Sequence, residues 1–259
     1  MKQPLYIGFG SQKGGVGKST IAEIMASVLH YHRHYNLLVI DCDETQNSFS
    51  ALRKRDHFIL TSENKMGQSL KEVFTSYGRK AYSVVSANVS QAKKLSDKLC
   101  KELGDIDIVF FDLPGRMNTA ELLMFSLSLD YIITPIEPDI QSMSSSLIYA
   151  STLQESRSKL NPAYVKVKDI LVVWNKVNRS VRKDTIDTFS PMIRDLKLNL
   201  LDSMLYASKK FSLELGEARD IKEVFRCSYL APSLVQMEGT GLREVIDEIE
   251  EKIIKPNIK

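Results

Sequence analysis

The chain has 259 residues, 43% of them hydrophobic and 26% charged, which is typical of a globular protein long enough to bury a sizeable core. Its formal charge of +3 does not by itself indicate a nucleic-acid partner, and its three cysteines form no CxxC pair, which argues against a disulfide framework or a cysteine metal site. The longest apolar runs are far below the roughly 18 residues needed to cross a bilayer, so we expect a cytoplasmic protein.

Short apolar runs alternate along the chain with longer stretches of helical periodicity, which is the pattern of β-α-β units. Several of the runs are continuously apolar, as buried parallel strands are. The sequence therefore predicts a single α/β domain with a mainly parallel, twisted sheet and helices on both faces. The expected strands are Leu5 to Phe9, Leu37 to Ile40, Ser83 to Ser86, Ile108 to Phe111, Tyr131 to Thr134 and Ile170 to Trp174.

Three stretches between and after these strands carry an apolar stripe at helical spacing. The first runs from Ile21 to Leu29, and the second begins after Asp139, a suitable N-cap, and should end before Pro162. The third, residues 241–254, has an acidic polar face that would repel anionic lipid, so we expect it to pack on the domain. Residues 47–65 are polar and basic, and they fit a surface excursion or a short helix and a loop.

Residues 11–20 read SQKGGVGKST, between an expected strand and an expected helix, which is the setting of a phosphate-binding loop. Glycine allows the backbone N–H groups to approach phosphates, Lys18 would reach the β and γ oxygens, and the Ser19 hydroxyl would bind Mg²⁺. Gln12 stands where the strict pattern has glycine, so the loop is a variant. The candidate nucleotide-binding residues here are Gly14, Gly15, Val16, Gly17, Lys18, Ser19 and Thr20.

Polar side chains also follow three later strands, at the edge of a parallel sheet where ligands bind. Asp112 fits a Mg²⁺ contact made through water, Asp41 is a further metal candidate, and Asp43 is placed to orient an attacking water. The alternative is that these aspartates only end strands as turn residues, which applies most to Asp41. Asn175 fits a contact with a purine base or an ordinary turn equally well.

Together these motifs resemble the ParA/MinD family of deviant P-loop ATPases, which includes plasmid and chromosome partition proteins. The resemblance rests on KGGVGKST, DCDETQNS, FFDLPG, PIEPD and VVWNK, in the family's order from residue 5 to about residue 180. It implies ATP or ADP with Mg²⁺ as cofactors, and an ATP-dependent homodimer in which Lys13 contacts the phosphates of the partner's nucleotide. The alternative for Lys13 is a contact with its own nucleotide or with solvent only.

Two departures from the family pattern touch the loops that sense the γ-phosphate. Gln46 comes one residue later than in the usual D-x-D-P-Q segment, and Gly115 replaces the second proline of D-x-P-P. We therefore expect a weak Mg²⁺-dependent ATPase whose hydrolysis is slow or needs a partner, and which a partner or DNA stimulates. The longer segment after Asp43 is similar to that of ParA-like proteins of conjugative elements.

The resemblance also implies partners, namely non-specific DNA and an activating protein of the ParB type. The basic patches that fit DNA, and fit an ordinary solvated face as well, are Arg53, Lys54 and Arg55; Arg179, Arg182 and Lys183; and Lys209 with Lys210. A small-molecule ligase or kinase of the dethiobiotin synthetase type is an alternative function. A MinD-like membrane positioner is disfavoured by the acidic terminal helix, so we expect no stable membrane association.

Overall fold

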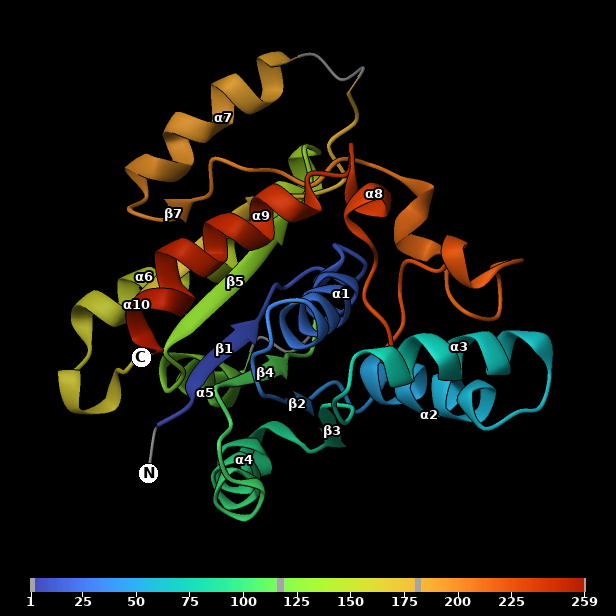
Figure 1. The fold of residues 1–259 in the computed structure, drawn as a ribbon. Helices are drawn as coiled ribbons and strands as arrows, with labels where there is room; N and C mark the ends of the chain where they lie inside the picture. The colour runs from blue at the N-terminus through green and yellow to red at the C-terminus, as the bar shows by residue number, and fades with distance from the viewer. Residues whose placement is uncertain (1–2, 116–118, 180–182, 259) are drawn as a thin grey trace.

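The fold is a single α/β domain, and the computed structural model describes residues 3–115, 119–179 and 183–258 (Figure 1). Seven strands form one sheet in the order β3-β2-β4-β1-β5-β6-β7, and every paired neighbour is parallel. The strands are β1 (Leu5–Phe9), β2 (Leu37–Asp41), β3 (Ser83–Ser86), β4 (Ile108–Asp112), β5 (Tyr131–Ile136), β6 (Asp169–Trp174) and β7 (Asn199–Leu200).

The predicted parallel sheet is confirmed, with six strands within two residues of their expected bounds. The seventh, β7, is an edge strand of two residues, too short for any apolar pattern to reveal it. In the strand order β1 lies between β4 and β5, so the loop that follows β1 emerges at the middle of the sheet, at the carboxyl ends of its strands.

Helices cover both faces of this sheet. Their bounds are α1 (Lys18–Tyr31), α2 (Ser48–Leu60), α3 (Lys65–Ser76), α4 (Val89–Leu103), α5 (Ala120–Leu127), α6 (Ile140–Lys159), α7 (Lys183–Asp195), α8 (Leu234–Met237), α9 (Leu242–Ile249) and α10 (Lys255–Asn257). The described part of the chain also has short helical turns, namely η1 (Pro162–Tyr164), η2 (Lys209–Ser212), η3 (Ile221–Glu223) and the π-helical turn η4 (Glu250–Ile254).

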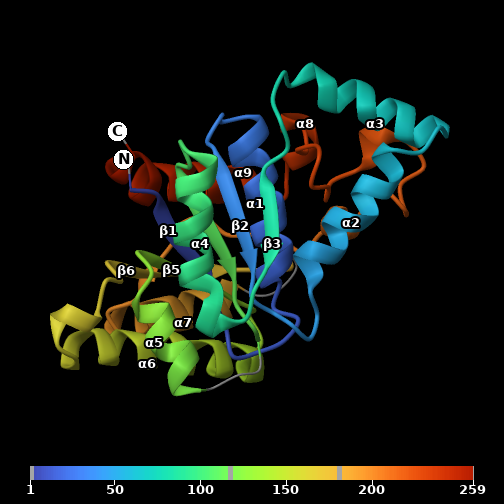
Figure 2. The same ribbon diagram turned by 90° about the horizontal axis from the view of Figure 1, so that it is seen from below.

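Alternate strand residues enter two separate cores, as the period of a strand requires. In β4, Phe110 packs with α1 and α9 on one face, whereas Val109 and Phe111 pack with α4, α5, α6 and α7 on the other. Figure 1 shows α1 and α9 on the first face, and Figure 2 shows the second group of helices from below. The 0% exposure of all three side chains reflects a sheet that is covered on both sides.

The polar stretch 47–65 is mainly helical. It contains all of α2, which buries Phe49 and Leu52 and packs beside α3 to form an arm at the β3 edge of the sheet (Figure 2). At the C-terminal end, the apolar residues of α9 are buried against α1. Among the described residues, no helix is both long and apolar enough to cross a membrane.

Candidate functional site

The glycine-rich loop joins β1 to α1 at the carboxyl end of the central strands. Gly15 and Gly17 have φ values of 80° and 91°, a left-handed conformation that side chains disfavour. A Cβ at Gly17 would also lie 2.5 Å from Asn175 Nδ2, so this position has no room for a side chain. Gly17 is the N-cap of α1, and the loop therefore presents backbone N–H groups at a helix N-terminus, where anions bind.

Two residues after β6 hold this loop in place. Asn175 Nδ2 donates a hydrogen bond of 2.8 Å to the carbonyl oxygen of Val16. Lys176 Nζ donates one of 2.6 Å to the carbonyl of Gly15 and forms an ion pair of 2.6 Å with Glu137. The contact of Asn175 with the loop was not predicted, and neither was the role of Lys176; the base contact predicted for Asn175 remains a prediction.

Lys18 and Asp112 are buried together beneath the loop. Strand pairing aligns Asp112 with Phe9 of β1 and Asp41 of β2, so Asp112 lies at the carboxyl end of the strands, as the loop does. Burial raises the pKa of Asp112 to about 7, and the nearby Ser19 hydroxyl and Lys18 ammonium oppose that rise. Burial lowers the pKa of Lys18, whereas Asp112 and Asp43 act to raise it.

The carboxylate of Asp112 fits a hydrated metal ion. It is fully buried, and neither of its oxygens has a hydrogen-bond partner of ordinary geometry among the described residues. Such a group is costly to bury unless a cation or a water molecule satisfies it. Mg²⁺ prefers oxygen ligands and keeps several of its waters, so a lone carboxylate beside the Ser19 hydroxyl suits it.

Asp41 and Asp43 lie beside Asp112 but have hydrogen bonds of their own. The Asp41 oxygens accept from the N–H groups of Asp43 at 3.3 Å and Ser50 at 2.9 Å, which ties β2 to the start of α2. One oxygen of Asp43 accepts from the Thr45 N–H at 3.2 Å, the Thr45 hydroxyl at 2.6 Å and the Gln46 N–H at 3.1 Å. The unusual Glu-Thr-Gln segment thus wraps around Asp43 and fixes its carboxylate.

Two cavities flank the loop. One, of about 560 Å³, includes Lys18, Asp43 and Gly115 in its lining. The other, of about 530 Å³, lies toward α1 and β6 and is lined partly by the C-terminal third of the chain, where the sequence shows no motif. Its lining residues are Gly17, Thr20, Ile21, Asn175, Lys176, Tyr206, Ala207, Ser208, Lys209, Phe211, Ser212 and Arg226.

Lys13 differs from Lys18 in its burial and in its place relative to the cavities. It is half-buried, it lines neither of these cavities, and its ammonium has no hydrogen-bond or ion-pair partner among the described residues. Its backbone N–H donates to the Ser11 hydroxyl at 3.3 Å, and that hydroxyl is hydrogen-bonded to Ser146 of α6 at 2.9 Å. The start of the loop is therefore anchored while the Lys13 side chain stays uncommitted.

Several residues of the basic patches, which were candidates for DNA contacts or for an ordinary solvated face, make contacts within the protein. The prediction that Arg53 belongs to a solvent- or DNA-facing patch is wrong, because its guanidinium lies between the rings of Tyr82 and Tyr229, 4.5 and 4.6 Å from their centroids. The remaining members differ in what they contact. Arg55 forms an ion pair with Glu214, Arg179 donates to the Gly239 carbonyl, and Lys210 donates to the carbonyls of Gln236 and Glu238. Lys54 and Lys209 are exposed. Arg182 and the side chain of Lys183 lie outside the described residues.

Comparisons with known proteins agree with this architecture. The family model described as the CobQ/CobB/MinD/ParA nucleotide binding domain matches residues 7–217. The uncharacterized protein BBD21 of Borreliella burgdorferi is 25% identical, over 85% of this chain and 96% of its own.

Solved structures share the fold at lower identity. A McdA–ATP complex from Cyanothece is 16% identical, with a TM-score of 0.62 over 100% of this chain and 98% of that one. A plasmid partition protein from Borrelia burgdorferi is 18% identical, with a TM-score of 0.54 over 80% of this chain and 92% of that one.

Proposed function

The chain belongs to the CobQ/CobB/MinD/ParA nucleotide-binding family, and we propose that it is an ATP-gated dimerising switch of the ParA type. The observation that carries this proposal is the contrast between two lysines of one loop. Lys18 is 7% exposed and lines the cavity beside the aspartates, whereas Lys13 is half-buried and lines neither cavity. A lysine that its own site does not use is available to a second copy of the chain.

The two cavities suggest how ATP would lie. The base and sugar would occupy the cavity beside Asn175, and the phosphates would cross the loop toward Lys18 and the aspartates. Backbone N–H groups from Gly14 to Lys18 would hold the phosphates. Ser19 and Asp112, with Asp41 nearby, would hold Mg²⁺, which neutralises phosphate charge when bound.

Asp43 is the residue we assign to hydrolysis of ATP to ADP and phosphate. Its carboxylate lines the cavity that also contains Lys18, and the hydrogen bonds from Thr45 and Gln46 hold one of its oxygens in place. A fixed carboxylate near the terminal phosphate can orient a water molecule, and positioning of this kind supplies most of the catalysis in phosphoryl transfer. We expect the rate to be low until a partner completes the site.

Dimerisation would follow from charge. The terminal phosphate of ATP concentrates negative charge, and Lys13 from a second copy would offset it; after hydrolysis and phosphate release the attraction weakens and the dimer opens. In the cell such a switch would position or partition DNA, or a conjugative transfer complex, with a ParB-type activator. The exposed lysines Lys54 and Lys209 are available for non-specific DNA contacts.

One measurement series tests this proposal: oligomeric state by light scattering, DNA retention and phosphate release, each without nucleotide, with ADP and with ATP. We expect a monomer that dimerises and retains DNA only with ATP, and loses the DNA as salt rises. A protein that stays monomeric in every state and releases phosphate only when a small-molecule substrate is added would instead be a ligase or kinase.

A further inference from the structure

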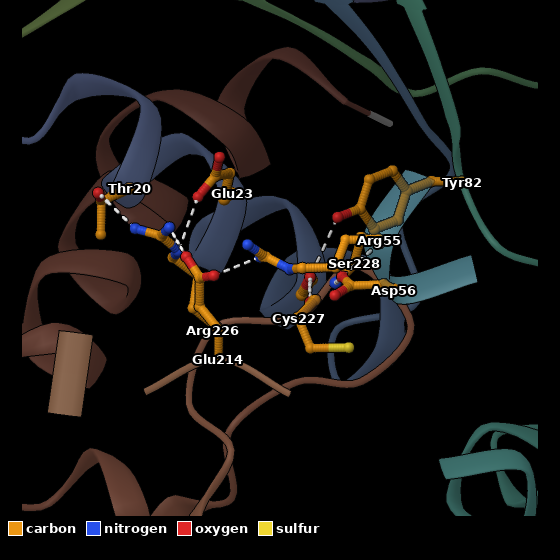
Figure 3. A network of polar contacts seen from close by, with 10 residues as sticks. Thr20, Glu23, Arg55, Asp56, Tyr82, Glu214, Arg226, Cys227 and Ser228 are labelled. Atoms are coloured by element: carbon orange, nitrogen blue, oxygen red, sulfur yellow. Dashed lines mark hydrogen bonds and ion pairs between the residues drawn. The ribbon is translucent and has the colours of Figure 1, made fainter. Parts of the chain in front are cut away.

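Arg226 lies beside the glycine-rich loop although it belongs to the C-terminal third of the chain, beyond the residues that the family model matches. The N–H groups of Phe225 and Arg226 both donate to the Leu213 carbonyl, and Arg226 pairs with Glu214 in an isolated bridge. This pairing brings the Arg226 side chain to the first turns of α1 (Figure 3). There it lines the cavity beside Gly17, which we assign to the base and sugar.

Three polar partners fix the guanidinium of Arg226. Its Nη1 donates a hydrogen bond of 3.2 Å to the hydroxyl of Thr20, directly after Ser19. Its Nε lies 3.2 Å from a Glu23 oxygen, close enough for an ion pair although not aligned for a hydrogen bond, and its Nη2 pairs with Glu214. Figure 3 shows the guanidinium between these partners.

The surroundings of Arg226 are unusually costly for a purely structural contact. Glu23 and Glu214 are only 2% and 8% exposed, and burying two carboxylates around one arginine often stabilises a fold less than apolar packing would. What the arrangement does provide is orientation. The guanidinium has five N–H donors in a rigid fork, so three contacts leave donors unused, and 23% of the side chain remains exposed.

The position of Arg226 along the loop indicates which part of the nucleotide it would meet. Lys18 lines the cavity at the terminal-phosphate end, and Asn175 lines the cavity at the base end. Arg226 lines the base-end cavity together with Asn175, and it donates to Thr20, the residue after Ser19. The phosphate nearest to a cavity that holds the base and sugar is the one attached to the ribose, so this is the anionic group that Arg226 would meet.

We propose that Arg226 binds the nucleotide by donating hydrogen bonds to the α-phosphate, with Glu23 and Glu214 holding its guanidinium in place. This inference rests on the proposed function, since it presumes that a nucleotide occupies the loop. Because ADP and ATP share the α-phosphate, Arg226 would contribute to the affinity for both equally. It would thus hold nucleotide through the cycle and not report on the γ-phosphate.

The test compares the affinities of ADP and AMPPNP, with Mg²⁺, for the wild-type protein and Arg226→Gln by calorimetry. We expect both to weaken about tenfold or more, as for the loss of a charge-assisted hydrogen bond, and Arg226→Lys to recover part of the loss. Arg55→Gln removes the other cation on Glu214 without touching the cavity, and Lys222→Gln removes an exposed charge that lies outside the cavity lining. Both controls should change affinity less than about twofold.

Several outcomes would overturn the inference. Unchanged affinity in a folded Arg226→Gln, a loss confined to AMPPNP, or an equal loss in Arg55→Gln would each do so. If Arg226→Gln does not fold, the test is made on the wild-type protein by measuring the modification of Arg226 by phenylglyoxal with mass spectrometry. ADP should protect Arg226 from this modification. Equal modification with and without ADP would contradict the proposal. Wild-type protein that binds neither nucleotide would instead refute the proposed function.

Discussion

Gly115 lies directly against the ammonium of Lys18: a Cβ at Gly115 would come within 2.8 Å of Lys18 Nζ and 3.4 Å of the Cα of Gly14. The resemblance to the ParA/MinD family leads one to expect proline at this position. Glycine here leaves room for Lys18 beside the loop, in a cavity that all three residues line. The departure is therefore part of how this chain packs its phosphate-binding lysine.

Gly115→Ala should weaken ADP binding about tenfold, because the added methyl group displaces the Lys18 ammonium and a hydrogen bond to a charged group is worth about 1.5 kcal/mol or more. Calorimetric titration with Mg²⁺-ADP measures the change. Gly216→Ala is the matched control, since a Cβ there meets nothing within 4 Å. Equal affinities for the two variants would show that Gly115 does not constrain Lys18.

Lys13→Ala should separate nucleotide binding from dimerisation. Its ammonium makes no hydrogen bond or ion pair with another described residue, so we expect the variant to fold and to bind ADP as the wild-type protein does. Dimers formed with ATP should disappear in light scattering. Lys18→Ala, which removes the buried lysine, should lose nucleotide binding itself. ATP-dependent dimers of Lys13→Ala would refute the assignment of Lys13 to the partner's site.

Asp43→Asn should lower phosphate release about 100-fold or more, the usual contribution of a positioned catalytic carboxylate, while ATP binding and dimerisation persist. The substitution preserves an oxygen that can accept the hydrogen bonds from Thr45 and Gln46, so the loop should keep its shape. Release is measured with Mg²⁺-ATP and with no added substrate. A rate that stays near the wild-type value would assign the water-orienting role to another residue.

The sequence predicted what local patterns encode. Continuous apolar runs located six strands, and the strand-loop-helix setting of the glycines located the phosphate loop. It could not show contacts between residues far apart in the chain. Lys176 holds the carbonyl of Gly15, and Arg226 touches Thr20, yet neither belongs to a motif with its partner. The run of charged residues at 53–55 predicted an exposed basic patch, and this was wrong for Arg53 for the same reason. Only the fold shows that aromatic rings enclose its guanidinium.

Arg53→Ala provides a test of that enclosure through stability. The guanidinium lies over the rings of Tyr82 and Tyr229, and a desolvated cation–π contact contributes about 2 kcal/mol. We therefore expect the free energy of unfolding to fall by about 2 kcal/mol in urea titrations. Lys54, the next residue of α2, is exposed, so Lys54→Ala should change the free energy of unfolding by less than about 0.5 kcal/mol.

DNA retention with ATP should show the opposite order of effects, with a larger loss for Lys54→Ala than for Arg53→Ala, since Lys54 faces solvent and Arg53 does not. An Arg53→Ala protein as stable as the wild type, with weaker DNA retention, would return Arg53 to the DNA-facing surface.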